Sequence, residues 1–130
     1  MSHLLALTIL ALRAVMGSAL TVGCYPEDYQ IVQNDLFDGL YSLDNDRISV
    51  LQPGTCERVV CNSNAAVYWC NDNEDRDAEV EYGQIAEAAW EIIRDCGMSA
   101  QRLIYAAGVV VYPTKIRVVV IKDNECLDQD

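Results

Sequence analysis

Six cysteines constrain the fold of this chain more than any other feature. They lie between residues 24 and 126 of a 130-residue chain, at Cys24, Cys56, Cys61, Cys70, Cys96 and Cys126. An even number of cysteines in a small exported domain predicts a disulfide framework. We therefore expect all six to be bonded, although the sequence leaves the pairing open. Bonded sulfur is neither a nucleophile nor a metal ligand, so we predict no metal site from the cysteines.

The first residues have the pattern of an export signal. Leu4–Leu12 is an apolar run, and residues 17–19 supply the small side chains of a cleavage site. This pattern is typical of a secretory signal peptide over residues 1–19, cut after Ala19. The run is too short for a transmembrane anchor, which needs about 20 apolar residues. A bacterial lipoprotein signal that ends at Cys24 is the alternative interpretation.

Residues 20–130 are predicted to form a single disulfide-rich domain with a large negative charge. Without Arg13, eight Lys and Arg stand against 20 Asp and Glu, a net charge of −12. Nucleic acid is therefore not an expected partner, because phosphate binding needs a basic face. Anionic membrane surfaces are disfavoured for the same reason. Pro113, Lys115 and Arg117 interrupt the apolar tract over residues 103–122, so we expect no stable membrane insertion.

The histidine content excludes several kinds of catalysis. His3 is the one histidine of the chain, and it lies in the predicted signal peptide. Nucleophilic triads and histidine-dependent acid–base chemistry need an imidazole that titrates near neutrality. The chain also has no glycine-rich phosphate loop, so we predict no cofactor. Carboxylate chemistry such as glycoside hydrolysis stays open, since it needs two facing acids.

Two β-rich runs, residues 56–61 and 65–70, flank a polar tripeptide and predict a β-hairpin. Centring the turn on the tripeptide places Cys56 opposite Cys70 and Cys61 opposite Ala65. Directly opposed Cα atoms lie about 4.5–5.5 Å apart, within reach of a disulfide. The predicted register therefore favours a Cys56–Cys70 bond.

The segment from Asn71 to Glu81 is rich in acids and is predicted to be a solvated charged loop. Calcium binding is the alternative, because oxygen ligands alternate at Asn71, Asn73, Asp75, Asp77 and Glu79. Two positions depart from the pattern of a calcium loop. Arg76 stands in place of the required glycine, and Tyr82 in place of the final acid.

Gly83–Cys96 is predicted to be a helix. Ile85, Ala89, Ile92 and Cys96 repeat at helical spacing and form its apolar face. Gly97 follows, where a left-handed C-terminal cap is expected. Trp90 lies at the margin of this face, and we interpret it as a packed edge rather than a ligand platform.

Three further segments are predicted to be strands: Ile48–Leu51, Leu103–Tyr112 and Ile116–Lys122. Gln30–Tyr41 has a mixed pattern that predicts no single element. The order of hairpin, helix and hairpin predicts an α+β fold. We expect one helix packed on a small antiparallel sheet of two β-hairpins, a sandwich stapled by disulfides.

Part of the chain resembles a known class of proteins. Gly54–Cys61 and Ala66–Asn73 are followed by Tyr82–Cys96 and by the sequence Asp-Asn-Glu-Cys at 123–126. These blocks resemble small secreted cysteine-rich proteins of filamentous fungi, over Tyr41 to Cys126. The layout also resembles the killer-toxin-like α/β sandwich of smut-fungus viral toxins and plant-pathogen effectors. The resemblance implies an effector-like role in virulence or competition, and it brings no catalytic residues.

Together these features favour a secreted protein that is not an enzyme and that binds an extracellular protein of a host or competitor. Tyr25, Tyr29 and Tyr41 are the candidate aromatic anchors for such binding. A small secreted hydrolase of cell-wall glycans that uses carboxylates is the alternative function. A calcium-dependent module built on residues 71–79 is a third hypothesis.

Overall fold

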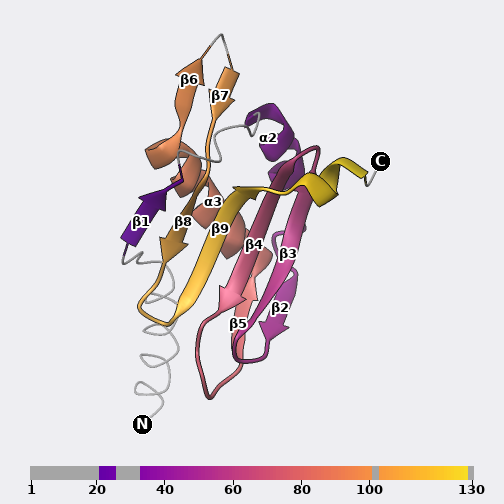
Figure 1. The fold of residues 1–130 in the computed structure, drawn as a ribbon. Helices are drawn as coiled ribbons and strands as arrows, with labels where there is room; N and C mark the ends of the chain where they lie inside the picture. Colours follow the sequence, from indigo (N-terminus) through magenta and orange to yellow (C-terminus); the bar gives the residue numbers. More distant parts are fainter. Residues whose placement is uncertain (1–20, 26–32, 101–102, 129–130) are drawn as a thin grey trace.

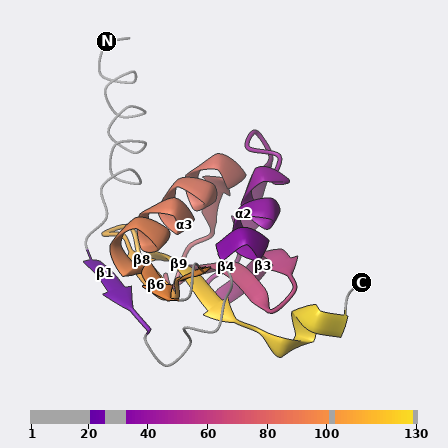
Figure 2. The same cartoon turned by 90° about the horizontal axis from the view of Figure 1, so that it is seen from above.

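A five-stranded antiparallel sheet with two helices on one of its faces forms the centre of the molecule (Figures 1 and 2). The computed structural model describes residues 21–25, 33–100 and 103–128. The sheet order is β1 (Thr21–Cys24), β8 (Gly108–Val111), β9 (Ile116–Lys122), β4 (Ala65–Asn71) and β3 (Thr55–Asn62). The predicted α+β sandwich is confirmed.

Smaller elements complete the fold. Two short antiparallel pairs join β2 (Ile48–Leu51) to β5 (Ala78–Glu81) and β6 (Met98–Ala100) to β7 (Leu103–Tyr105). The described helices are α2 (Gln33–Tyr41), α3 (Tyr82–Cys96) and the 3-10 helix η2 (Asn124–Asp128). Among the described residues, no helix is long and apolar enough to cross a bilayer.

Helix α3 confirms the predicted helix, and it begins one residue earlier. The predicted apolar face, Ile85, Ala89, Ile92 and Cys96, is buried. The start of α3 has a capping box, in which the Glu81 N–H donates to Gln84 Oε1 at 3.0 Å. The predicted left-handed cap at Gly97 is wrong. Its φ of −63° and ψ of 135° are extended, because the chain runs directly into β6.

Helix α2 lies in the segment that predicted no single element. Leu36 and Leu40, four residues apart, are 0% and 3% exposed, and they bury one side of the helix. Gly39 lets this helix approach β3 closely. A Cβ atom at Gly39 would collide with the side chain of Val60. The helix is short and has only a few apolar residues, so its helical periodicity is weak in the sequence.

The predicted hairpin is formed by β3 and β4, and its Cys56–Cys70 pairing is confirmed. Cys61, however, faces Ala66 and not Ala65. The physical reason is a shorter turn combined with an extra residue in the strand. The register shifts between Arg58 and Val60, at a β-bulge that restores the cysteine pairing further along.

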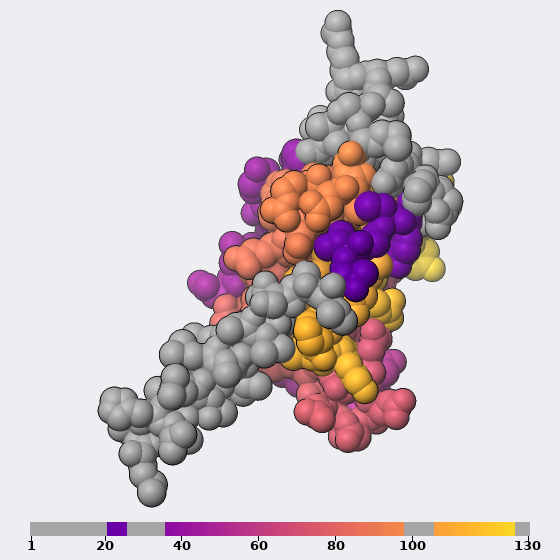
Figure 3. Space-filling view, turned by 90° about the vertical axis from the view of Figure 1, so that its left-hand side faces the viewer, coloured from indigo at the N-terminus to yellow at the C-terminus, as the bar shows by residue number. Residues whose placement is uncertain are grey.

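All six cysteines are bonded, as predicted, and none is free. The bonds are Cys24–Cys96, Cys56–Cys70 and Cys61–Cys126. The first joins the edge strand β1 to the last residue of α3. In the space-filling view β1 (indigo) lies at the surface, next to β8 and the end of α3 (Figure 3). The sulfur of Cys24 that a lipoprotein signal would acylate is used in this bond.

Two predicted segments have different boundaries in the structure. The predicted strand Leu103–Tyr112 is divided into β7 and β8, which are separated by two buried alanines. The division occurs before Gly108, where a Cβ atom would collide with the carbonyl oxygen of Gly23 in β1. The predicted acidic loop ends at Asp77, because the following residues form β5 and pair with β2. Ile48–Leu51 and Ile116–Lys122 are strands, as predicted.

Candidate functional site

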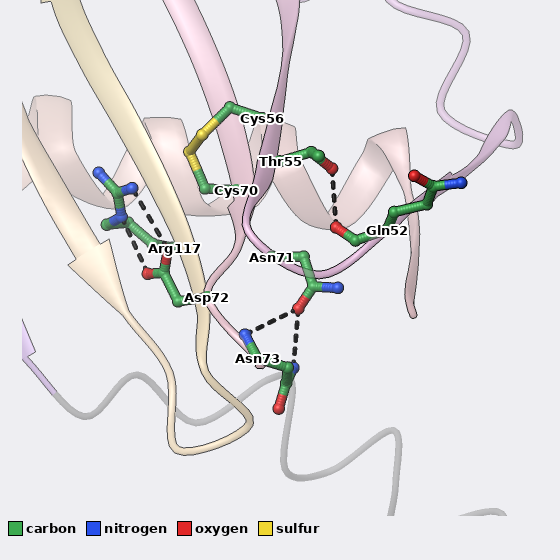
Figure 4. Close-up of a disulfide and its surroundings, with 8 residues drawn as sticks. All are labelled: Gln52, Thr55, Cys56, Cys70, Asn71, Asp72, Asn73 and Arg117. Atoms are coloured by element: carbon green, nitrogen blue, oxygen red, sulfur yellow. Dashed lines mark hydrogen bonds and ion pairs between the residues drawn. A yellow bond between two sulfur atoms is a disulfide. The ribbon is translucent and has the colours of Figure 1, made fainter. Parts of the chain in front are cut away.

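The acidic loop is shaped by one buried asparagine. Asn71 is fully buried, and its Nδ2 donates to the main-chain oxygens of Leu51 at 3.0 Å and Arg76 at 2.9 Å. Its Oδ1 accepts from the N–H of Asn73 at 3.0 Å and from the Asn73 side chain at 2.8 Å (Figure 4). The Asn73 amide also donates to the carbonyl oxygen of Thr114 at 3.1 Å. Asn71 therefore ties the loop to β2 and, through Asn73, to the turn between β8 and β9.

This network bears on the calcium hypothesis. Asn71 was predicted as the first of the alternating oxygen ligands, but its oxygen already accepts two hydrogen bonds inside the loop. Within the described part of the chain, no three His, Cys, Asp or Glu side chains come together as a group that could hold a metal ion. The buried carboxamide of Asn71 shapes the loop, because both its Nδ2 and its Oδ1 form hydrogen bonds.

An open hollow of about 1020 Å³ lies between this loop, β5, the start of α3 and the β8–β9 turn. The loop (pink) protrudes next to that turn (amber) at the lower end of the molecule (Figure 3). Five carboxylates line the hollow: Glu74, Asp75, Asp77, Glu79 and Glu81. Two cations, Arg76 and Lys115, also line it, and Arg76 lies 3.6 Å from Asp75. The hollow is therefore a strongly negative depression.

The five carboxylates of the hollow make it the place to look for the glycan hydrolase of the alternative prediction. Such an enzyme needs two carboxylates at a set separation across the sugar. A tryptophan-lined cleft beside the carboxylates would support this alternative, yet none of the described residues that line the hollow is aromatic. The hydrolase stays an untested prediction.

A second surface feature is a cluster of three aromatic side chains, which we call the aromatic cluster: Phe37, Tyr41 and Trp90. Phe37 and Tyr41 come from α2, and Trp90 from α3, and the two helices lie on the same side of the sheet (Figure 2). Ring centroids lie 4.7 Å apart for Phe37 and Trp90, 5.5 Å for Tyr41 and Trp90, and 6.5 Å for Phe37 and Tyr41. These separations are those of interacting aromatic pairs.

The cluster is buried at one end and exposed at the other. Phe37 and Trp90 are half-buried and pack against the core, whereas Tyr41 is 76% exposed. The packed edge predicted for Trp90 is confirmed. Because two neighbours hold its ring from one side, Tyr41 presents a large aromatic surface to solvent from a fixed position.

The three tyrosines predicted as anchors differ in where they lie. Tyr41 is exposed and belongs to the aromatic cluster. Tyr25 is half-buried against the core, and its N–H donates to the carbonyl oxygen of Ala107 at 2.9 Å, so it is not an exposed anchor. Tyr29 lies outside the described residues. Phe37 is not among the predicted anchors, although its spacing of four from Tyr41 is a helical signal.

A third feature is a polar cluster that connects β3, β4 and the end of β9. Asp123 Oδ2 accepts from the Tyr68 hydroxyl at 2.6 Å and from Arg58 Nη1 at 3.1 Å. The Tyr68 hydrogen bond is the main cause that lowers the pKa of Asp123, with the Glu125 N–H and Arg58 adding to it. Burial is the main cause that raises the pKa of Tyr68. The partners satisfy one another, so we interpret this cluster as structural.

Comparison with known protein families, with curated proteins and with solved structures finds no match to this chain. The candidate sites therefore stand on the residues themselves.

Proposed function

We propose that this chain is a secreted, non-enzymatic effector-like or killer-toxin-like protein that acts by binding an extracellular protein of a host or competitor. The observation that carries this proposal is the aromatic cluster. Tyrosine and tryptophan are over-represented among the residues that dominate binding energy at protein interfaces. Tyr41 offers such a side chain with 76% of its surface exposed.

Rigidity supports the proposal. The disulfide Cys24–Cys96 fixes the end of α3, the helix that carries Trp90, to the edge of the sheet. Leu36 and Leu40 hold α2 against the core. A surface that is ordered before binding loses less conformational entropy when a partner docks. Three disulfides and an exposed, supported aromatic ring suit a protein whose activity is binding.

Photo-crosslinking tests the proposal. A benzophenone amino acid replaces Tyr41 in the oxidised full chain, and a matched protein carries it at Asn124, which is exposed on η2. Each is added to extracellular fluid from host tissue or to a surface extract of competitor cells. We expect one protein to crosslink from position 41 and not from position 124.

Competition makes the result specific. Excess unmodified protein should abolish the crosslink, and the Tyr41→Ser variant should compete at least about tenfold less well. Because Tyr41 is 76% exposed, this substitution should lower the melting temperature only slightly. The proposal is wrong if both positions capture the same set of proteins, or if Tyr41→Ser competes as well as the parent.

A further inference from the structure

Within the described part of the chain, strand β5 has one unpaired edge. It pairs with β2 on one side, in a sheet of two strands. The Tyr82 N–H donates to the carbonyl oxygen of Arg47 at 2.9 Å. This bond extends the pairing of β2 with β5, in which Glu81 lies opposite Ile48. In an antiparallel pair, hydrogen-bonded and non-hydrogen-bonded residue pairs alternate. The main-chain N–H and C=O groups of Ala78 and Val80 therefore point toward β2. Those of Glu79 point away from β2.

That edge borders the acidic hollow. The residues of β5 line one side of it, and the turn residues Pro113–Ile116 line another. Its volume of about 1020 Å³ is at the upper end of the range of ligand sites, about 300–1,000 Å³. Unpaired N–H and C=O groups on a strand edge are a template for a further strand. Here the template has open space beside it.

Charge selects the occupant. The hollow carries five carboxylates against two cations. A second copy of this chain would bring its own acidic edge, so pairing between copies is disfavoured by repulsion. A segment with Lys or Arg at alternate positions would place its charges on one face, because side chains of a strand alternate. Ile48, 56% exposed and lining the same hollow, offers an apolar surface for the aliphatic stems of such side chains.

We propose that the edge of β5 binds an extended basic segment of a partner protein, which adds as a strand with its Lys or Arg side chains over the carboxylates of the hollow. Main-chain hydrogen bonds to Glu79 would hold the segment, and the carboxylates would select its charge. This site is separate from the aromatic cluster and does not depend on it.

The probe is a synthetic peptide of about eight residues, the length of a common strand, that alternates Lys and Thr and has blocked ends. Its binding to the oxidised full chain is measured by fluorescence anisotropy at about 50 mM salt. We expect saturable binding that weakens as salt is raised, because opposite charges drive the encounter. A peptide with Glu at each Lys position should not bind.

Two charge-reversal variants locate the site. Asp77→Lys with Glu79→Lys reverses the charge of two exposed residues of the hollow and spares the cap residue Glu81. Asp38→Lys with Glu87→Lys makes the same change of net charge on the exposed sides of α2 and α3. We expect the first pair to weaken binding at least about tenfold, and the second less than about twofold.

A third peptide tests strand addition rather than charge alone. It has the parent sequence, with methyl groups on alternate backbone nitrogens, so that it keeps every charge but loses the donors that would reach β5. We expect it to bind at least about tenfold more weakly, the effect of losing hydrogen bonds. The proposal is overturned if this peptide binds as well as the parent, if both variants weaken binding equally, or if the parent does not bind saturably. None of these outcomes affects crosslinking from position 41.

Discussion

Cys24 of the edge strand β1 is bonded to Cys96, the last residue of α3, and this bond spans 72 residues of the chain. The Cys56–Cys70 bond spans only 14 residues, between directly opposed positions of β3 and β4. A cross-link stabilises mainly by restricting the unfolded chain, so the longer loop should contribute more. The Cys24–Cys96 bond should therefore add more to the free energy of unfolding than the Cys56–Cys70 bond.

The first prediction compares these bonds. Replacing Cys24 and Cys96 by Ala should lower the free energy of unfolding by about 4 kcal/mol, and replacing Cys56 and Cys70 by about 3 kcal/mol, from loop length alone. Urea denaturation of both variants measures the difference. A larger loss for the Cys56–Cys70 pair would show that loop closure is not the main source of stability.

The second prediction concerns the buried asparagine of the acidic loop. Asn71→Ala removes two donors and an acceptor, and it leaves buried partners on β2 and the loop unpaired. We expect a loss of about 2–4 kcal/mol in the free energy of unfolding and faster proteolysis after residue 71. Asp72→Ala, which breaks an exposed pair with Arg117, is the control and should cost less than about 1 kcal/mol. Equal losses would contradict the role of Asn71.

Calcium provides a further check on this loop. If the Asn71 carboxamide shapes the loop without a cation, calcium should raise the melting temperature of neither the parent nor Asn71→Ala. Calorimetric heat on titration with calcium would instead support the calcium-dependent module.

The helix α3 and the hairpin of β3 and β4 could be predicted because their signals are local. Ile85, Ala89 and Ile92 repeat at the helical period, and two β-rich runs flank a short polar turn. The Cys56–Cys70 bond followed from the hairpin alone. The bulge after Arg58 could not be predicted, since an added residue changes the register without changing the composition of the run.

The remaining features depend on contacts between distant segments. The pairing of Thr21 with Val111, and of Ile48 with Glu81, joins short strands whose partners no local pattern identifies. The aromatic cluster needs Trp90 to meet α2, which follows only from the packing of both helices on one face. The acid content of the hollow was visible in the sequence, but the approach of the turn 113–116 to the acidic loop was not.

The third prediction is a pH dependence at Asp123. Its pKa is lowered from 3.8 in the folded protein, so the stability it contributes is present above that value and is lost as the pH falls through the lower folded value. Asp123→Asn should therefore lower the free energy of unfolding at pH 7 by about 1–3 kcal/mol. In strong acid the parent carboxyl is protonated too, and the difference between the two proteins should narrow. Urea denaturation as a function of pH measures this difference.

The control for Asp123 is Asp38→Asn, on the exposed side of α2. It should change the free energy of unfolding little at either pH. A deficit of Asp123→Asn that stays constant from neutral pH to strong acid would contradict the electrostatic role of the carboxylate.

The fourth prediction concerns a buried tyrosine. Burial, with Glu91 and Glu87 nearby, raises the pKa of Tyr112 to about 12. Because the folded state holds this proton longer than the unfolded state, the stability linked to Tyr112 is lost as the pH rises above 10, the ordinary value, towards 12. Absorbance titration of the native protein should show a late step near pH 12 that loses amplitude in Tyr112→Phe. Exposed Tyr41→Phe is the control, and it should leave that late step in place.

The most direct test of the whole account is mass spectrometry of the protein recovered from its native source, with free thiols alkylated and disulfides kept intact. We expect an extracellular protein that starts at Leu20 and yields only three linked peptide pairs, Cys24–Cys96, Cys56–Cys70 and Cys61–Cys126. A protein that stays inside the cell with residues 1–19 attached and its cysteines alkylated would contradict it.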